Sequence, residues 1–188
     1  MLRTRELIAV RPVRVVAKKA LVVLVIAIGC IGSLALMASA ANAQDVRTTA
    51  SMTALKEKTA KLGAPRIEEN DIGGKSVPVL YFGSTKMNNN FNLVDEIGKE
   101  DLGMAATLFV KAGDEFIRVA TSVLLPDGKR AVGTVLAPPA LDSIKAGKPY
   151  YGEVDVLGTL YVTGYEPIKD AAGETIGAYF VGYMKAGF

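Results

Sequence analysis

Apolar and polar positions divide the chain into a helical start and a strand-rich remainder. Residues 44–62 carry Ala, Leu, Lys, Glu and Met without Gly or Pro, which predicts a helix that ends at Gly63 and Pro65. The predicted apolar face of this helix is thin and comprises Val46, Ala50, Leu55 and Leu62. Beyond it, short apolar runs alternate with turn residues, a pattern typical of strands.

Six of these runs have strand composition, and two other segments are predicted to be short helices. The predicted strands cover residues 76–82, 106–110, 116–125, 152–157, 159–168 and 175–183. The predicted short helices cover residues 91–97 and 139–146. Pro78 argues that the first strand lies at an edge. The pattern therefore predicts an α+β fold with a five- to six-stranded antiparallel sheet, an N-terminal helix and short helices.

The first 43 residues have the three-part layout of a secretory signal peptide. A basic start precedes an apolar stretch at residues 20–37, and Ala41 and Ala43 offer the small residues that a signal peptidase reads. We therefore predict cleavage before Gln44 and a periplasmic or secreted protein. Two alternatives stay open: an uncleaved membrane anchor, since about 18 apolar residues can span a bilayer, and a lipoprotein modified at Cys30.

Removing this leader changes the charge balance. The whole chain has 22 Lys and Arg against 19 Asp and Glu, a net charge of +3. Residues 1–43 hold six of the basic and one of the acidic residues, so the remainder has 16 and 18, a net charge of −2. A nucleic-acid partner is not expected, because it would need a basic patch on the folded part.

Catalytic chemistry has little support in the sequence. The chain has no histidine, and its single cysteine, Cys30, lies in the leader. The commonest general base, a thiol nucleophile and the usual zinc ligands are therefore missing from the mature part. No Gly-x-Ser-x-Gly elbow or phosphate-binding loop is present either. We predict a protein that is not an enzyme and that carries no metal, haem or nucleotide cofactor.

The strongest candidate for ligand binding is Arg118, which lies among apolar residues of a predicted strand. On a regular strand, its face is shared with Phe116, Ala120 and Ser122. A cation in such a place needs an anionic partner, and arginine is suited to holding a carboxylate with two parallel bonds. The partner is then either a ligand carboxylate or a structural one, for instance Asp155 or Glu166.

Six of the seven tyrosines lie after residue 149. Tyr161, Thr163 and Tyr165 share one strand face by the two-residue period, and Tyr150 opens the preceding strand. Tyrosine suits the wall of a small-ligand pocket, although the same rings could simply fill the core. The candidate ligand-binding residues are therefore Arg118, Ser122, Tyr150, Tyr161, Thr163 and Tyr165.

Several motifs in residues 116–181 also carry a family resemblance. They include Asp127-Gly128-Lys129-Arg130, Pro149-Tyr150-Tyr151-Gly152-Glu153 and Tyr161-Val162-Thr163-Gly164-Tyr165. The tract resembles the single Cache sensor domain, in particular the Cache 3/Cache 2 fusion group found outside the membrane in bacterial chemoreceptors, over roughly residues 72–183. The resemblance implies a PAS-like fold, a pocket against this part of the sheet, and a role in sensing, chemotaxis and signal transduction.

Together with the leader and the first helix, the resemblance predicts a domain plan: a signal peptide at 1–43, an N-terminal helix at 44–66 and a Cache-like sensor domain at 67–188. Cache domains in receptors lie between two membrane spans and precede a signalling part, and we expect this protein to lack a second span and such a part. We expect a sensor of a small organic carboxylate that works with a membrane receptor or sensor kinase. The alternative is a ligand-free interaction module that forms a homodimer or docks on a membrane signalling partner.

Overall fold

The computed structural model describes residues 46–72 and 75–185. The predicted signal peptide, the alternative membrane anchor and Cys30 lie outside these residues. Among the residues that are described, no helix is long and apolar enough to cross a bilayer. The account below concerns the compact unit that begins at Ala43.

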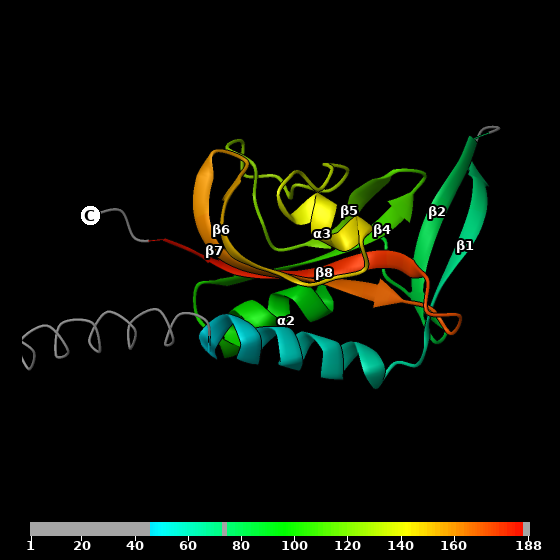
Figure 1. Cartoon of the computed structure of the whole chain (residues 1–188), viewed down its shortest axis with the longest axis horizontal. Coiled ribbons are helices and arrows are strands. Elements are labelled where there is room, and N and C mark those ends of the chain that lie inside the picture. The colour runs from blue at the N-terminus through cyan, green and yellow to red at the C-terminus, as the bar shows by residue number, and fades with distance from the viewer. Residues whose placement is uncertain (1–45, 73–74, 186–188) are drawn as a thin grey trace, which may run out of the picture. The chain divides into compact units, whose positions relative to one another are not determined.

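A five-stranded antiparallel sheet forms the centre of this unit (Figure 1). Its strands are β4 (Met104–Ala112), β5 (Glu115–Thr121), β6 (Tyr150–Val156), β7 (Thr159–Lys169) and β8 (Thr175–Met184). They are ordered β5-β4-β8-β7-β6 across the sheet. β4, the first of the five along the chain, therefore pairs with β8, the last, and β8 is the central strand. Tight turns join the hairpins, and Gly113 between β4 and β5 has a φ of 60°, which favours glycine. The predicted PAS-like α+β fold is confirmed.

Both faces of the sheet are covered (Figure 1). The helix that runs through residues 46–60 and α2 (Asn92–Glu100) lie on one face, and α3 (Ala140–Lys145) lies on the other. The long connection between β5 and β6, residues 122–149, folds over the same face as α3 and buries Val123, Ala131 and Leu136 there. The candidate site lies beneath this connection.

A second, three-stranded sheet corrects one prediction. β1 (Pro65–Ile72), β2 (Lys75–Phe82) and β3 (Thr85–Lys86) pair in that order, so the segment predicted at 76–82 does not join the main sheet. β3 reaches only the last two residues of β2, and Pro78 therefore has a strand on one side alone, as its missing N–H requires. β1 was not predicted, because its charged sequence lacks the apolar alternation of a half-buried strand.

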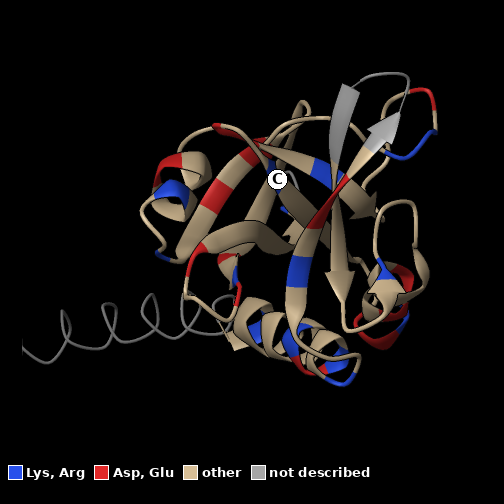
Figure 2. Ribbon diagram, turned by 90° about the vertical axis from the view of Figure 1, so that its right-hand side faces the viewer, with Lys and Arg blue, Asp and Glu red and all other residues tan. Residues whose placement is uncertain are grey.

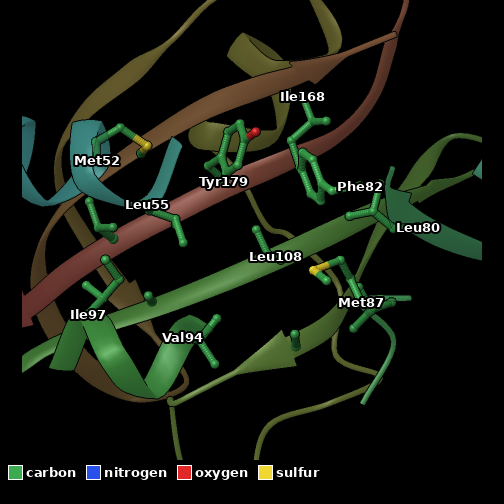
Figure 3. Close-up of a cluster of buried hydrophobic side chains, with 14 of the residues drawn as sticks. Met52, Leu55, Leu80, Phe82, Met87, Val94, Ile97, Leu108, Ile168 and Tyr179 are labelled. Carbon is green, nitrogen blue, oxygen red and sulfur yellow. The ribbon is translucent and has the colours of Figure 1, made fainter. Parts of the chain in front are cut away.

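The N-terminal helix buries Leu55 and packs Leu62 against the core as predicted, but the first half of its buried face differs from the prediction. Val46 is 66% exposed and Ala50 is exposed, whereas Met52 and Leu55 pack in the core together with α2, β2 and β8 (Figure 3). The buried stripe also contains three hydroxyl residues, Thr48, Ser51 and Thr59. The Thr59 hydroxyl lies 3.1 Å from that of Tyr179, and this bond offsets the cost of burying both groups. A pattern search for apolar residues misses such a face.

Candidate functional site

A β-bulge sets the direction of the Arg118 side chain. Leu108 pairs with Ala120 and Phe109 pairs with Arg118, so Val119 has no partner on β4. Arg118 consequently shares its face with Phe116, on the α3 side of the sheet. Ala120 belongs to the core on the opposite face, which the N-terminal helix and α2 cover. The predicted shared face with Ala120 was wrong, because the extra residue shifts the alternation by one position.

The guanidinium of Arg118 is buried and has few partners. The residue is 3% exposed. Its Nη1 donates a hydrogen bond of 2.6 Å to Thr134 Oγ1, and its Cζ lies 5.0 Å from the centre of the Phe109 ring. Its Nε is buried without any hydrogen-bond partner, the one side-chain nitrogen or oxygen of the described residues in that state. A guanidinium has five N–H donors, and the bond to Thr134 uses one of them.

The structural ion pair considered from the sequence is not formed. Across residues 46–72 and 75–185, no carboxylate lies within ion-pair distance of Arg118. Glu166 instead binds Lys56 Nζ at 2.6 Å and accepts a bond of 2.7 Å from the Tyr151 hydroxyl. Asp155 accepts a bond from the backbone N–H of Gly158 in the turn after β6.

The connection after β5 closes over Arg118. Residues 133–136 run antiparallel along the outer edge of β5, where Arg118 N–H donates to Thr134 O and Gly133 N–H donates to Arg118 O, both at 2.9 Å. The Thr134 hydroxyl also donates to Ala131 O at 2.8 Å, which orients its lone pairs toward the guanidinium. Thr134 was not among the predicted site residues, because its contact with Arg118 depends on the path of this connection.

A small cavity adjoins the guanidinium. Its volume is about 50 Å³, and it is lined by Arg118, Val135, Leu136, Ala137, Val154, Asp155, Val156, Leu157 and Tyr165. Val154, Val156 and Tyr165 belong to the same buried cluster on this face of the sheet. The cavity therefore combines a cation, a phenol and aliphatic side chains, and polar and apolar surface contribute to its walls about equally.

Electrostatics at the site favour a protonated cation beside neutral phenols. Burial lowers the pKa of Arg118, and its interactions with Tyr165 and Tyr161 raise that pKa by less. Burial likewise raises the pKa of Tyr165 and Tyr161, and the Arg118 charge opposes this only in part. Arginine remains charged at neutral pH despite such a shift. The site can therefore attract an anion and can offer it phenolic hydrogen bonds.

The other predicted site residues fall into two groups. Tyr161 and Tyr165 are buried on the Arg118 face, with the Tyr165 ring centre 4.9 Å from that of Phe180, and Tyr150 packs against Tyr165 at 6.3 Å. The hydroxyls of Thr163 and Ser122 are used within the sheet. Thr163 Oγ1 donates to Gly152 O at 2.7 Å, and Ser122 Oγ accepts a bond of 2.9 Å from Ala106 N–H.

A second hollow near Arg118 has a different character. Its volume is about 180 Å³, and it is lined by Pro78, Asn88, Asn89, Val110, Ile117, Arg118, Val119, Val132 and Gly133. The side-chain amide of Asn88 is already bonded to β2, where Oδ1 accepts from Leu80 N–H and Nδ2 donates to Pro78 O. This hollow thus presents mostly apolar surface, and the smaller cavity is the better place for a polar ligand.

Elsewhere on the described surface, charges of both signs are interspersed over helices and strands (Figure 2). Many of them form pairs, such as Lys58 with Glu96 and Glu100. No group of three or more acidic, His or Cys side chains within the described residues lies close enough to hold a metal ion. Arg118 is set apart from these charges by being buried beside a cavity, which makes its surroundings the candidate binding site.

Comparison with protein families agrees with the fold. The chain matches the Cache 3/Cache 2 fusion domain over residues 32–188. The chain belongs to the Cache family. A search of curated proteins gave no significant match. The match confirms the resemblance drawn from the sequence, and it begins within the predicted leader.

Cache domains are extracytoplasmic sensory domains that bind small molecules and act with membrane receptors. Their role is sensory rather than catalytic. Membership in this family therefore places the chain among small-molecule sensory domains.

Proposed function

We propose that this Cache domain binds a small organic carboxylate through Arg118, in the cavity beneath residues 133–137. The observation that carries the proposal is the Nε of Arg118, which is buried without a hydrogen-bond partner while no carboxylate of the described residues pairs with the charge. A ligand carboxylate would supply both the missing acceptor and the missing negative charge.

The physical argument is the cost of a buried, unpaired cation. Taking a guanidinium out of water costs several kcal/mol, and protein retains such a group where a partner or a function offsets that cost. Hydrogen bonds between arginine and a carboxylate are charge-assisted, about twice as strong as neutral ones, and frequently paired. Thr134 occupies Nη1 alone, so the remaining donors are left for the ligand.

Contacts of Arg130 connect the segment over the cavity to the rest of the domain. The connection that covers the cavity is tied to α2, because Arg130 Nη1 and Nη2 bind Asp95 at 2.8 and 2.9 Å. Arg130 Nη1 further donates to Thr121 O at 2.6 Å, at the end of β5. A ligand that moves this connection would therefore also move α2, on the opposite face of the sheet. A membrane receptor or sensor kinase is the proposed partner of that face.

The family supports a location outside the cytoplasm, and the predicted leader suggests how the protein arrives there. A sensor outside the cytoplasm needs an export signal, and we propose that cleavage before Gln44 releases the domain into the periplasm or beyond. The intact mass of protein recovered from the periplasm tests this step. Full-length mass in the membrane fraction would indicate an anchor instead, and a lipid adduct on Cys30 would indicate a lipoprotein.

Binding is tested by calorimetry on wild-type protein and on Arg118→Lys. Lysine keeps the charge but loses the fork that binds a carboxylate with two bonds. The affinity for a small carboxylate should fall by about 1.5–3 kcal/mol, the range for a hydrogen bond to a charged group. Arg66→Lys is the matched control, since Arg66 is exposed and pairs with Glu68 on the surface.

Unchanged affinity in Arg118→Lys would place the ligand elsewhere. If no small carboxylate, amine or amino acid raises the melting temperature of the wild type, the ligand-free interaction module becomes the better explanation. A ligand present at 100 times its dissociation constant adds about 2.7 kcal/mol of stability, so a true ligand is readily detected.

A further inference from the structure

Large apolar side chains are exposed at one end of the central sheet. β4 begins and β8 ends at this end, because the two strands pair antiparallel. The β6–β7 hairpin turns there as well, since Tyr161 near the start of β7 pairs with Met184 at the end of β8. The N-terminal helix begins there too, because Arg47 Nη2 donates a bond of 2.7 Å to Leu102 O in the turn before β4. These elements meet at the left of Figure 1.

The tips of these elements carry five of the eight large apolar side chains that are exposed among the described residues. Leu102, in the turn between α2 and β4, is 89% exposed. Apolar surface gathered in this way marks contact with a partner protein or a membrane. We call these five side chains the apolar end: Val46, Leu102, Leu157, Leu160 and Met184.

The hairpin keeps Leu157 at a position that disfavours it. Leu157 and Gly158 form the turn between β6 and β7, with φ values of 56° and 87°. Such a two-residue turn prefers Asn-Gly, and a bulky apolar residue at positive φ is an outlier. Strain of this kind persists at sites that have a function. Leu157 borders the cavity beside Arg118 with part of its side chain, but 41% of the residue stays exposed and is free to meet an external partner.

The arrangement of these side chains favours a fluid partner over a second folded chain. Met184 pairs with Tyr161 and therefore points to the α3 side of the sheet, whereas Leu160 points to the opposite side. Leu102 and Leu157 lie at the tips of two separate turns. A stable protein–protein interface needs a complementary surface of roughly 800 Å² per partner. Separate tips do not provide such a surface, whereas a lipid bilayer takes up each side chain independently.

The preceding part of the chain brings this end to a membrane. The predicted apolar stretch at residues 20–37 enters a bilayer during export, whether it is then cleaved off or retained as an anchor. Residues 38–45 join this stretch to Val46, and eight extended residues span at most about 26–29 Å. The apolar end is therefore the part of the domain that first meets the lipid surface outside the cytoplasm.

The charges beside the apolar end add little attraction to lipid. Arg47 pairs with Asp101 and Lys185 pairs with Glu153, each with an N–O distance of 2.6 Å. Both cations are therefore largely neutralised by their partners. Binding to a bilayer should then come from the burial of apolar surface, which salt does not screen.

From this geometry we propose that the apolar end inserts into the lipid surface of the membrane that the protein has crossed, and that it holds the domain there after the leader is removed. Binding of this kind grows with the apolar area that is buried among the lipids. The inference goes beyond the proposed function, because it does not depend on a ligand at Arg118. It places the sensor beside a membrane receptor.

The test is flotation of the mature protein, residues 44–188, with vesicles of phosphatidylcholine alone and with vesicles that also contain phosphatidylglycerol. The protein should float with both kinds of vesicle. The bound fraction should change by less than about twofold between low and high salt, because the contact is apolar.

Two variants each remove one apolar tip. Leu102→Asn and Leu157→Asn should each weaken partitioning into the vesicles roughly tenfold, since each loses the burial of a leucine side chain. Val132→Asn is the matched control. Val132 is also exposed, but it lies beside Val110 and Ile117, toward the opposite end of β4 and β5. This control should bind vesicles as the wild type does.

Thermal unfolding without vesicles separates a membrane role from a folding role. Asparagine is favoured at the first position of this turn, so Leu157→Asn should melt at or above the wild-type temperature while it loses vesicle binding. Leu102→Asn should melt as the wild type does, because Leu102 is exposed. Leu102 does not line the cavity beside Arg118, so failure of this inference would leave the proposed function standing.

Three outcomes would overturn the inference. The first is wild-type protein that does not float with either kind of vesicle. The second is equal vesicle binding by Leu102→Asn and Val132→Asn. The third is a wild-type dimer in gel filtration that Leu102→Asn converts to a monomer without any flotation, which would assign the apolar end to a second copy of the chain.

Discussion

Replacing Arg118 with Met should abolish ligand binding and leave the ligand-free protein equally stable or more stable. Methionine has similar length but no charge, so the substitution removes the buried cation and keeps most of the packing. The variant loses the bond to Thr134, worth about 1.5–3 kcal/mol, and the contact with the Phe109 ring, worth about 0.5–2 kcal/mol. It also removes the desolvation cost of the cation, which is several kcal/mol.

The removed desolvation cost slightly exceeds the lost contacts, so Arg118→Met should be slightly more stable than the ligand-free wild type. Apolar replacements of buried ions are often neutral or stabilising by about 1–4 kcal/mol, and the sulfur of Met gains about 0.3–1.5 kcal/mol against an aromatic ring. We expect the free energy of unfolding to rise by about 1 kcal/mol, which corresponds to roughly 2–6 °C in melting temperature for a domain of this size.

The assay is urea unfolding of dialysed protein, with and without a saturating carboxylate, followed by circular dichroism. The carboxylate should stabilise the wild type and have no effect on Arg118→Met. Arg66→Met, which alters an exposed arginine, should change stability by less than about 0.5 kcal/mol. A loss of about 3–5 kcal/mol in ligand-free Arg118→Met would refute the reasoning, because that is the cost of breaking a buried structural pair.

Three further predictions concern the surrounding structure. Hydrogen bonds from Arg47 hold the pKa of Asp101 below its ordinary value, so Asp101→Asn should cost about 0.5–1 kcal/mol near pH 7. That difference should be complete above about pH 5 and shrink as the pH falls through the lowered pKa, as urea unfolding at pH 7 and pH 3 would measure. A double-mutant cycle with Arg130→Met and Asp95→Asn should give a coupling free energy of about 1 kcal/mol. Both single variants should also show faster amide exchange than the wild type in the connection over the cavity. Gly177→Ala should cost about 3 kcal/mol in thermal unfolding, since its Cβ would lie 2.4 Å from a backbone carbonyl oxygen of β4.

Each of these has its own check. A difference between wild type and Asp101→Asn that is the same at pH 3 as at pH 7 would mean that the carboxylate charge is not the cause. A parallel double-mutant cycle on the exposed pair Lys129 and Asp127 should show no measurable coupling free energy. Equal coupling free energies in the two cycles would contradict the inference that Arg130 holds the connection to α2. For Gly177, the control is Gly152→Ala, where the added Cβ meets only the flexible end of the Tyr150 side chain. Equal costs for the two glycine variants would contradict the close approach of β4 and β8.

Much of the fold could be predicted because it depends on local pattern. The strands at β6, β7 and β8 have clear apolar runs between turn residues, and their predicted bounds differ from the observed ones by only one or two residues. Tyr161, Thr163 and Tyr165 share a face as predicted, since β7 pairs with both neighbouring strands without a bulge over these residues. The burial of Arg118 likewise followed from its apolar neighbours.

The details of the candidate site needed the tertiary structure. The bulge at Val119 arises from how β4 and β5 fit together, and it turned Ala120 away from the Arg118 face. The strand predicted to continue to residue 125 ends at Thr121, where the chain turns to cover the cavity. The contact between Arg118 and Thr134 spans 16 residues and depends on that path.

The sequence by itself determined most of the strands, that the chain is a Cache-like sensor without histidine chemistry, and that one arginine lies within an apolar strand. Composition and two-residue periodicity record these properties directly, because they depend on neighbouring residues. Only the tertiary structure decided which face Arg118 occupies, that no carboxylate of the described residues neutralises it, and how small its cavity is. Those properties depend on contacts between distant segments, where a shift of one residue in register reverses the direction of every side chain that follows.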